Sequence, residues 1–411
     1  MQATFSNSAR EQRYLSLEDK YGAHNYHPLP VVLERGQGVH VWDVDGKRYY
    51  DFLSGYSAVN QGHCHPDIVA AMIEQAQQLT LTSRAFHSAL LGEYAQFITA
   101  YFGYNKVLPM NTGVEAVETA IKLARRWGYD VKGIEANKAI IIVCSGNFHG
   151  RTSTVISFSS DPSARNGFGP YMEGFISIPF NDLNALSEAL KSPNIAGFLV
   201  EPIQGEAGVV VPDEGYLTKA KQYCADANVL FIADEIQTGL SRTGKLLACD
   251  HENVRPDILI LGKALSGGTM PVSAVLADDP IMLTIKPGEH GSTYGGSPLA
   301  CKVAIAALTV LKKERMADNA EKMGELLRKK LEDLHSPHIK LIRGKGLLNA
   351  IVIEHKNADA AWDLCLAMKE NGILAKPTHG DKIRLAPPLV IDAEQIEECV
   401  QLIGKSLSVL D

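Results

Sequence analysis

The sequence predicts an α/β fold: a large, mostly parallel sheet covered by helices, followed by a smaller α+β domain. Three observations predict it. Between residues 60 and 296, short continuous apolar stretches alternate with helix-like stretches, which is typical of βαβ units covered on both faces. From residue 297 the pattern changes to a long helix-favouring stretch. The chain has 411 residues, 45% of them hydrophobic, enough to build two cores.

The first element expected is a β-hairpin in the N-terminal segment, 1–59. Residues 39–44 and 47–50 are strand-like, and Asp45-Gly46 between them favours a type I′ turn, in which both central residues have positive φ. We expect this segment to pack with the smaller C-terminal domain.

The second segment, 60–296, is expected to form the large domain. Helices are predicted at 66–79, 114–127 and 216–227, and buried strands at 139–143, 197–200, 229–233 and 258–261. In such sheets, ligands bind beyond the carboxyl ends of the strands. The third segment, 297–411, is expected to form the small domain. Its predicted elements are a helical stretch at 299–334, strands at 339–342 and 347–353, a helix at 358–371, and a last helix from 393.

Composition excludes several classes of protein. The net charge is −7, with 47 acidic and 40 basic residues mixed along the chain, so nucleic acid and anionic membranes are poor partners. The longest apolar runs, such as 139–144, are far too short to span a bilayer. Seven scattered cysteines without a CxxC pair indicate a reducing compartment. We expect the cytoplasm; the alternative is the mitochondrial matrix, for a chain without its transit peptide.

Two motifs suggest other functions. Residues 239–246 (GLSRTGKL) have P-loop spacing, which would make the protein a nucleotide-binding switch, but Leu246 stands where a P-loop needs a hydroxyl residue. His63 and His65 could ligate a metal, yet no second cluster completes a tetrahedral set. We therefore expect ordinary loops at both places and no metal.

A stronger constellation lies at two predicted strand ends. Asp234 closes the strand 229–233, and Lys263 follows the strand 258–261. A lysine partly removed from water becomes a nucleophile towards an aldehyde. A buried carboxylate opposite it suits the ring nitrogen of pyridoxal phosphate. The alternatives are a helix-capping Asp and a solvated Lys.

A phosphate would need a cradle of N–H groups. Residues 110–115 (MNTGVE) lead from a strand into a helix, whose N-terminus attracts phosphate. Thr112 and Glu115 also have the spacing of a capping box, and both roles are compatible. The glycine-rich stretch 290–296 (HGSTYGG) offers further hydroxyl and N–H groups.

Several motifs occur together in one order along the chain. They are YGAHNY at 21–26, NQGHCHP at 60–66, EPIQGE at 201–206, ADEIQTG at 233–239, LGKA at 261–264 and RGKGL at 343–347. From residue 21 to the C-terminus, the chain resembles the class III aminotransferases, pyridoxal-phosphate enzymes of fold type I. The resemblance implies a sheet of the seven-stranded type in the large domain.

The resemblance also implies roles for single residues at the cofactor. Lys263 would form the imine with the cofactor aldehyde, and Asp234 would pair with the ring nitrogen. The other implied cofactor contacts are Gln237 at the ring hydroxyl, Phe148 stacked on the ring, Gly113 and Val114 at the phosphate, and Ser292 and Thr293 at the phosphate of the neighbouring subunit. A homodimer with shared sites, and possibly a higher oligomer, follows from the last of these.

Within the family, the resemblance is to members that transfer the terminal amino group of ornithine to 2-oxoglutarate. It implies that Arg384 binds the carboxylate near the ring, that Arg151 binds the distal one, and that Glu206 covers Arg384 while ornithine is bound. Tyr26, together with Arg151, would receive the head group of ornithine, and Tyr56 would narrow the pocket. The alternative substrates are N-acetylornithine, lysine and 4-aminobutyrate.

Overall fold

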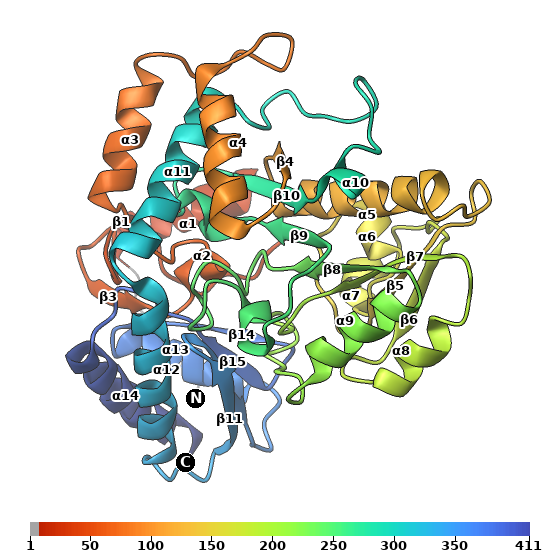
Figure 1. The fold of residues 1–411 in the computed structure, drawn as a ribbon. Coiled ribbons are helices and arrows are strands. Elements are labelled where there is room, and N and C mark those ends of the chain that lie inside the picture. Colours follow the sequence, from red (N-terminus) through yellow and green to blue (C-terminus); the bar gives the residue numbers. More distant parts are fainter. Residues whose placement is uncertain (1–7) are drawn as a thin grey trace.

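The computed structural model describes residues 8–411; residues 1–7 of the predicted N-terminal segment lie outside the described residues. Its centre is a seven-stranded sheet in the order β4-β10-β9-β8-β7-β5-β6 (Figure 1). All neighbours are parallel except β10, which runs antiparallel to β4 and β9. The predicted α/β fold is confirmed. The strands are β4 (Lys106–Met110), β5 (Ile140–Cys144), β6 (Phe175–Ile178), β7 (Ile195–Val200), β8 (Leu230–Asp234), β9 (Ile258–Leu261) and β10 (Ser273–Ala277).

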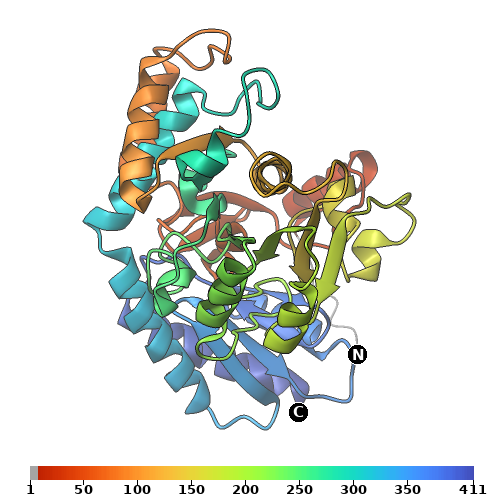
Figure 2. The ribbon, with the colours of Figure 1, turned by 45° about the vertical axis from the view of Figure 1, so that its right-hand side comes forward.

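Helices cover both faces of this sheet, which explains why its strands are continuously apolar. Helix α5 (Gly113–Asp130) lies across one face, and α8 (Leu183–Ala189) with α9 (Tyr216–Asp226) lies across the other. Figure 2 shows α5 nearly end-on, with the sheet between it and the helices of the opposite face. Every residue of β7 is buried, because both of its faces lie under helices.

Further helices surround the large sheet. Near β4, α11 (Pro298–Lys313) packs against α3 (Pro66–Ala76) and α4 (Ala89–Phe102). None of the helices in the described part of the chain has the length and apolar character needed to cross a bilayer. Short helical turns complete this part: α6 (Ser153–Ile156), α7 (Pro162–Arg165), η1 (Ala248–Glu252), η2 (Lys263–Ser266) and α10 (Asp279–Met282).

The C-terminal part contains a second sheet, antiparallel, in the order β11-β12-β15-β14. Its strands are β11 (Ile339–Lys345), β12 (Leu348–Ile353), β14 (Lys376–Thr378) and β15 (Lys382–Leu385), and its helices are α12 (Met316–Glu332), α13 (Ala360–Glu370), α14 (Ala393–Leu407) and η3 (Ser408–Leu410).

The expected helical stretch at 299–334 is present, but it forms two helices instead of one. Two helices, α11 and α12, meet at Arg315, whose φ of +52° is left-handed. The residues around the break, Lys312 to Arg315, are good helix formers, so local propensity conceals it. The break lets α11 pack against α3, α4 and η2 while α12 packs beside β11 and α14.

The N-terminal segment begins with α1 (Ala9–Tyr21), which sequence patterning did not reveal, and continues into β1 (Leu33–Gln37), β2 (His40–Asp43) and β3 (Arg48–Asp51). The β2–β3 hairpin is present as predicted, but its turn is not type I′. Only Gly46 has positive φ, and the N–H of Asp43 donates to the carbonyl of Lys47, closing a three-residue loop. Asp43 Oδ1 accepts the N–H groups of Asp45 and Lys47 and stabilises this wider loop. Strand β13 (Ile373–Leu374) pairs with β3.

Candidate active site

Asp234 and Lys263 lie at the carboxyl edge of the large sheet. Asp234 ends β8, which is parallel to its neighbour β9, and Lys263 follows β9 after one glycine. Both line one cavity of ≈ 200 Å³. The other described residues that line it are Gly113, Val114, Phe148, His149, Gly150, Glu201, Glu206, Ile236, Gln237 and Thr238.

Lys263 begins the turn η2 with a φ of +44°, an unfavourable value for a side chain of this size. Burial lowers the pKa of its amine, while the nearby carboxylates of Glu206, Asp234 and Glu201 act in the opposite direction. A lysine with a lowered pKa is uncharged for a larger fraction of the time and is a better nucleophile. Backbone strain of this kind is typical of functional sites.

Asp234 is buried and held on both oxygens. Oδ1 accepts the N–H of Ile236 at 3.1 Å, and Oδ2 lies 2.7 Å from Nδ1 of His149. Burial alone would lower the pKa of His149, but the hydrogen bond and charge of Asp234, with Glu201 nearby, raise it above its ordinary value. The imidazole therefore fixes the position of the Asp234 carboxylate and partly balances its charge.

Glu201 follows β7, between the strand ends that carry Asp234 and His149. Its Oε2 accepts the N–H of Phe148 at 3.0 Å, so it also holds the loop that carries the Phe148 ring. Burial raises the pKa of Glu201 to about 7. The Glu201 carboxyl is therefore, besides the Lys263 amine, another group at the cavity that can hold a proton.

The first turn of α5 forms the opposite wall. Glu115 reaches back to the N–H of Thr112 at 2.7 Å, as the capping-box spacing predicts. Val114 is packed tightly: a Cβ built on Gly150 would lie 2.4 Å from Val114 Cγ2. The helix N-terminus therefore approaches the cavity closely enough for its N–H groups to bind an anion.

Arg384 and Glu206 form an ion pair at the cavity. Arg384 Nη1 lies 2.7 Å from Glu206 Oε1, and Nη2 lies 3.4 Å from Oε2. The Arg384 side chain is 3% exposed. Burial alone would raise the pKa of Glu206, but Arg384, Lys263 and Gln237 lower it below its ordinary value. A buried arginine is thus covered by an internal carboxylate.

Tyr56 belongs to this cluster, since its ring lies 5.2 Å from the guanidinium carbon of Arg384. It sits on α2 (Ser54–Ser57), a single helical turn with positive φ at all four residues. Left-handed turns cost roughly 1–2 kcal/mol for each residue with a side chain. The Ser54 hydroxyl, donating to the carbonyl of Ala386, and Gln237 Nε2, 3.3 Å from the carbonyl of Tyr56, help to hold it.

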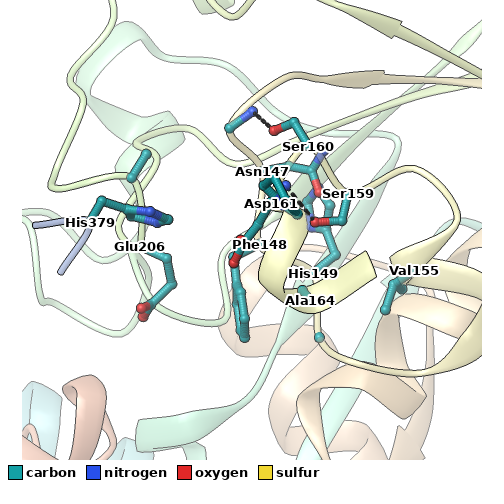
Figure 3. Close-up of a pocket in the computed structure, with 14 residues that line it drawn as sticks. Asn147, Phe148, His149, Val155, Ser159, Ser160, Asp161, Ala164, Glu206 and His379 are labelled. Atoms are coloured by element: carbon teal, nitrogen blue, oxygen red, sulfur yellow. Dashed lines mark hydrogen bonds between the residues drawn. The ribbon is translucent and has the colours of Figure 1, made fainter. Parts of the chain in front are cut away.

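A second cavity of ≈ 270 Å³ shares Phe148, His149, Gly150 and Glu206 with the first one and is also lined by His379 (Figure 3). Arg151, predicted to bind the distal carboxylate, is exposed, and its guanidinium lies 5.5 Å from the Phe148 ring. Tyr26 is 66% exposed and lines a neighbouring groove with Tyr56. The described residues that line the cavity therefore include neither Arg151 nor Tyr26.

Ser292 and Thr293 do not lie with the other predicted cofactor-binding residues at the cavity. They lie on the loop before α11, and the described residues that line the cavity do not include them. Ser292 Oγ accepts a hydrogen bond from Asn111 Nδ2 at 2.7 Å, next to the N-terminus of α5. His290 anchors the same loop through contacts with Thr119 and Lys122 on α5.

The residues of the cavity fit pyridoxal phosphate. Gln237 Oε1 and His149 Nε2 are buried polar atoms without a hydrogen-bond partner among the described residues, and Gln237 Oε1 can accept from a ring hydroxyl. Asp234 offers a carboxylate for a ring nitrogen, Lys263 an amine for an aldehyde, and the α5 N-terminus a cradle for a phosphate.

Sequence reasoning did not assign His149 or Glu201 to the site. A signal was available for both, because each follows an apolar strand whose carboxyl end faces the ligand side of the sheet. Residues 239–246 form a turn, buried except at its end, in which the N–H of Ser241 donates to the carbonyl of Leu246, instead of a strand, loop and helix. His63 and His65 contact different carboxylates, Asp51 and Glu314.

Comparison with known proteins agrees with this geometry. A family model described as aminotransferase class-III matches residues 21–407. A rat protein named ornithine aminotransferase, mitochondrial, is 65% identical over 95% of this chain and 89% of its own length.

Two solved structures match nearly the whole chain. An ornithine aminotransferase from Toxoplasma gondii, with pyridoxal phosphate at partial occupancy in its active site, has a TM-score of 0.96 and 50% identity, covering 97% of this chain and 94% of that one. An acetylornithine aminotransferase from Elizabethkingia anophelis has a TM-score of 0.89 and 59% identity, covering 97% and 99%.

Proposed function

The chain belongs to the class III aminotransferases, and from this premise we propose that it transfers the terminal amino group of ornithine to 2-oxoglutarate. The cofactor is pyridoxal phosphate. The products are glutamate and glutamate 5-semialdehyde, which cyclises to pyrroline-5-carboxylate. The observation that carries this choice of substrate is the Arg384–Glu206 pair, a carboxylate site that the protein itself covers.

Five residues would hold the cofactor: Asp234 at the ring nitrogen, Gln237 at the ring hydroxyl, Phe148 on the ring face, and Gly113 with Val114 at the phosphate. Pyridoxal phosphate, when bound, supplies an electron-withdrawing ring that stabilises the charge left on carbon when a C–H bond next to nitrogen breaks.

The chain's own residues do the rest. Asp234, held in place by His149, would pair with the ring nitrogen of the cofactor. Lys263 Nζ would move the proton: as a base it would take the proton from the substrate carbon that bears the reacting amino group, and as an acid it would give the proton back. Its lowered pKa suits both steps.

The Arg384–Glu206 pair lets one site accept two substrates. Glutamate and 2-oxoglutarate carry a carboxylate next to the reacting carbon, which displaces Glu206 and binds Arg384, while Arg151 binds the distal carboxylate. Ornithine has no carboxylate near its reacting end, so Glu206 stays on Arg384. Tyr26 and Arg151 then receive the distal head group of ornithine, and Tyr56 narrows the pocket beside the ring.

We further propose a homodimer with shared sites. The loop that carries Ser292 and Thr293 is exposed beside α5, where it can reach the phosphate of a neighbouring subunit. Sedimentation of the holoenzyme tests the mass. Mixing a Lys263→Ala chain with a Thr293→Ala chain tests sharing, because a mixed dimer contains one site with both changes and one with neither. Recovery of activity on mixing supports shared sites, and no recovery contradicts them.

The division into structural units and the cellular compartment are also proposals. The three segments 1–59, 60–296 and 297–411 are proposed as structural units, the first packed with the third; the pairing of β3 with β13 supports this. The cytoplasm is the proposed compartment, with the mitochondrial matrix as the alternative that the rat relative's name favours. Localising the tagged full-length protein decides between them.

A panel of amino donors with 2-oxoglutarate as acceptor tests the proposed function. Ornithine should yield glutamate and a pyrroline that an aromatic amine traps, whereas N-acetylornithine, lysine and 4-aminobutyrate should react much more slowly. Preference for N-acetylornithine, the substrate in the name of the Elizabethkingia protein, would overturn the choice of donor. Borohydride reduction and peptide mapping should place the cofactor on Lys263, and an unmodified Lys263 peptide would overturn the mechanism.

A further inference from the structure

Strand β14 (Lys376–Thr378) is the short outer strand of the C-terminal sheet, and it lies beside the strand that carries the substrate-binding arginine. Lys376 is the register partner of Arg384 on β15, and Thr378 pairs with Lys382. The backbone of β14 therefore helps to fix where β15 presents Arg384.

The first and third side chains of β14 reach two other parts of the substrate site. Lys376 Nζ donates to the carbonyl of His27 at 2.7 Å, next to Tyr26 in the chain. Thr378 Oγ1 donates to the carbonyl of Glu206 at 2.8 Å. Residues two apart on a strand share a face, so one face of β14 holds both segments.

The Lys376 contact has a reinforcing partner. The His27 ring stacks on Trp362 of α13, with centroids 4.4 Å apart and planes 11° from parallel. Tyr26 itself is 66% exposed, so its position depends largely on how its neighbour His27 is held. Two independent contacts from the small domain thus fix the segment that receives the head group of ornithine.

We propose that β14 positions the two substrate-selecting groups separately: Lys376 holds Tyr26 in place for ornithine, and Thr378 holds Glu206 over Arg384. This inference rests on the proposed function and assigns positioning residues to it. The two contacts act on different substrate poses. Loss of the Lys376 contact weakens ornithine binding alone, because glutamate places no head group on Tyr26. Loss of the Thr378 contact loosens the cover on Arg384 and favours substrates that carry a carboxylate near the reacting carbon.

Matched pairs of variants of the holoenzyme test this division. Lys376→Met removes the donor and keeps the length, whereas Lys376→Arg keeps a donor. Losing one hydrogen bond from a charged donor should raise the KM for ornithine about tenfold, with kcat and the KM for glutamate changed less than about twofold, and Lys376→Arg should restore most of the loss.

The second pair is Thr378→Val, which removes the hydroxyl at nearly constant shape, and Thr378→Ser, which keeps it. Thr378→Val should raise kcat/KM for glutamate relative to ornithine about threefold to tenfold, as expected for one neutral hydrogen bond. Thr378→Ser should behave like the unchanged protein. Both substitutions thus raise kcat/KM for glutamate relative to ornithine. Lys376→Met does so by weakening ornithine binding, and Thr378→Val does so by easing access of a carboxylate to Arg384.

Equal effects of either variant on both substrates, or no effect, would overturn the inference and leave β14 a purely structural strand. If Lys376→Met does not fold, Lys376→Gln decides the same question, because glutamine is shorter and uncharged, with Lys376→Arg again as the control. An ornithine-specific rise in KM for Lys376→Gln alone supports the inference, and a uniform loss overturns it. Failure of the unchanged protein to transaminate ornithine would instead overturn the proposed function.

Discussion

Replacing Glu206 by alanine should change which amino donors the enzyme prefers. In the folded protein, Arg384 is 3% exposed and its only carboxylate partner among the described ion pairs is Glu206. Without Glu206, ornithine binding leaves this guanidinium buried and unpaired, whereas an α-amino acid brings its own carboxylate. The substitution therefore weakens the binding of ornithine. It strengthens the binding of α-amino acids, which no longer have to displace Glu206.

The geometry sets the size of the effect. Breaking a buried pair costs about 3–5 kcal/mol. The second Arg384–Glu206 contact is long, at 3.4 Å, and the Glu206 side chain is 21% exposed, so the low end of about 3 kcal/mol applies. At about 1.4 kcal/mol per factor of ten, the ratio of kcat/KM for glutamate over ornithine should rise on the order of a hundredfold.

Rapid mixing provides the assay, because the yellow colour of the cofactor bleaches when an amino donor reacts. Bleaching rates with ornithine and with glutamate give the ratio directly. Glu206→Gln is the matched control, because its amide oxygen can still accept a hydrogen bond from Arg384 but carries no charge. Its ratio of glutamate to ornithine rates should lie between those of the unchanged protein and Glu206→Ala. An unchanged ratio in Glu206→Ala would refute the idea that Glu206 covers Arg384.

Three further results are expected. The rate at which cofactor-free protein takes up pyridoxal phosphate should rise with pH to a midpoint below the ordinary lysine pKa of about 10.4, because burial lowers the pKa of Lys263 and the neutral amine is the reactive form; a midpoint at or above that value contradicts this. Gly150→Ala should weaken cofactor binding about tenfold or more in a titration, since the new Cβ would lie 2.4 Å from Val114, while Gly167→Ala, also at positive φ but in open space, should bind normally; equal affinities of both variants would exclude the steric cause. Arg242→Met should lower the free energy of unfolding in urea by about 3–5 kcal/mol, because this fully buried guanidinium donates to an amide oxygen and two carbonyls that would lose their partner; a loss under about 1 kcal/mol would show that water replaces it.

The strand ends of the site could be predicted because their signal is local. A continuous apolar run predicts a buried strand, and the first polar residues after it, Asp234 and Lys263, must emerge at the carboxyl edge where ligands bind. The capping box at Thr112 has the same character, since it depends on a spacing of three residues. These features need only the chain within about ten residues.

Other parts of the site depend on contacts between distant segments. Glu206 and Arg384 are 178 residues apart in the chain, and His149 and Asp234 are 85 apart. Spacing and periodicity say nothing about such pairs; the first was suggested only by family resemblance, and the second was not foreseen. The break at Arg315 was concealed for a related reason, because good helix formers there yield to the separate packing of α11 and α12.

The amino-acid sequence by itself determined the α/β fold, the order of its elements and the chemistry available at the sheet edge, because these follow from local polarity and turn preferences. Only the tertiary structure decided which charged side chains pair with each other, such as Arg384 with Glu206 and His149 with Asp234. The left-handed turn at Tyr56, the histidine beside Asp234 and the contacts of β14 with His27 and Glu206 arise where remote parts of the chain are packed together. These contacts are strong because they are buried. Burial removes water from the charged and polar groups, so each group depends on its protein partner.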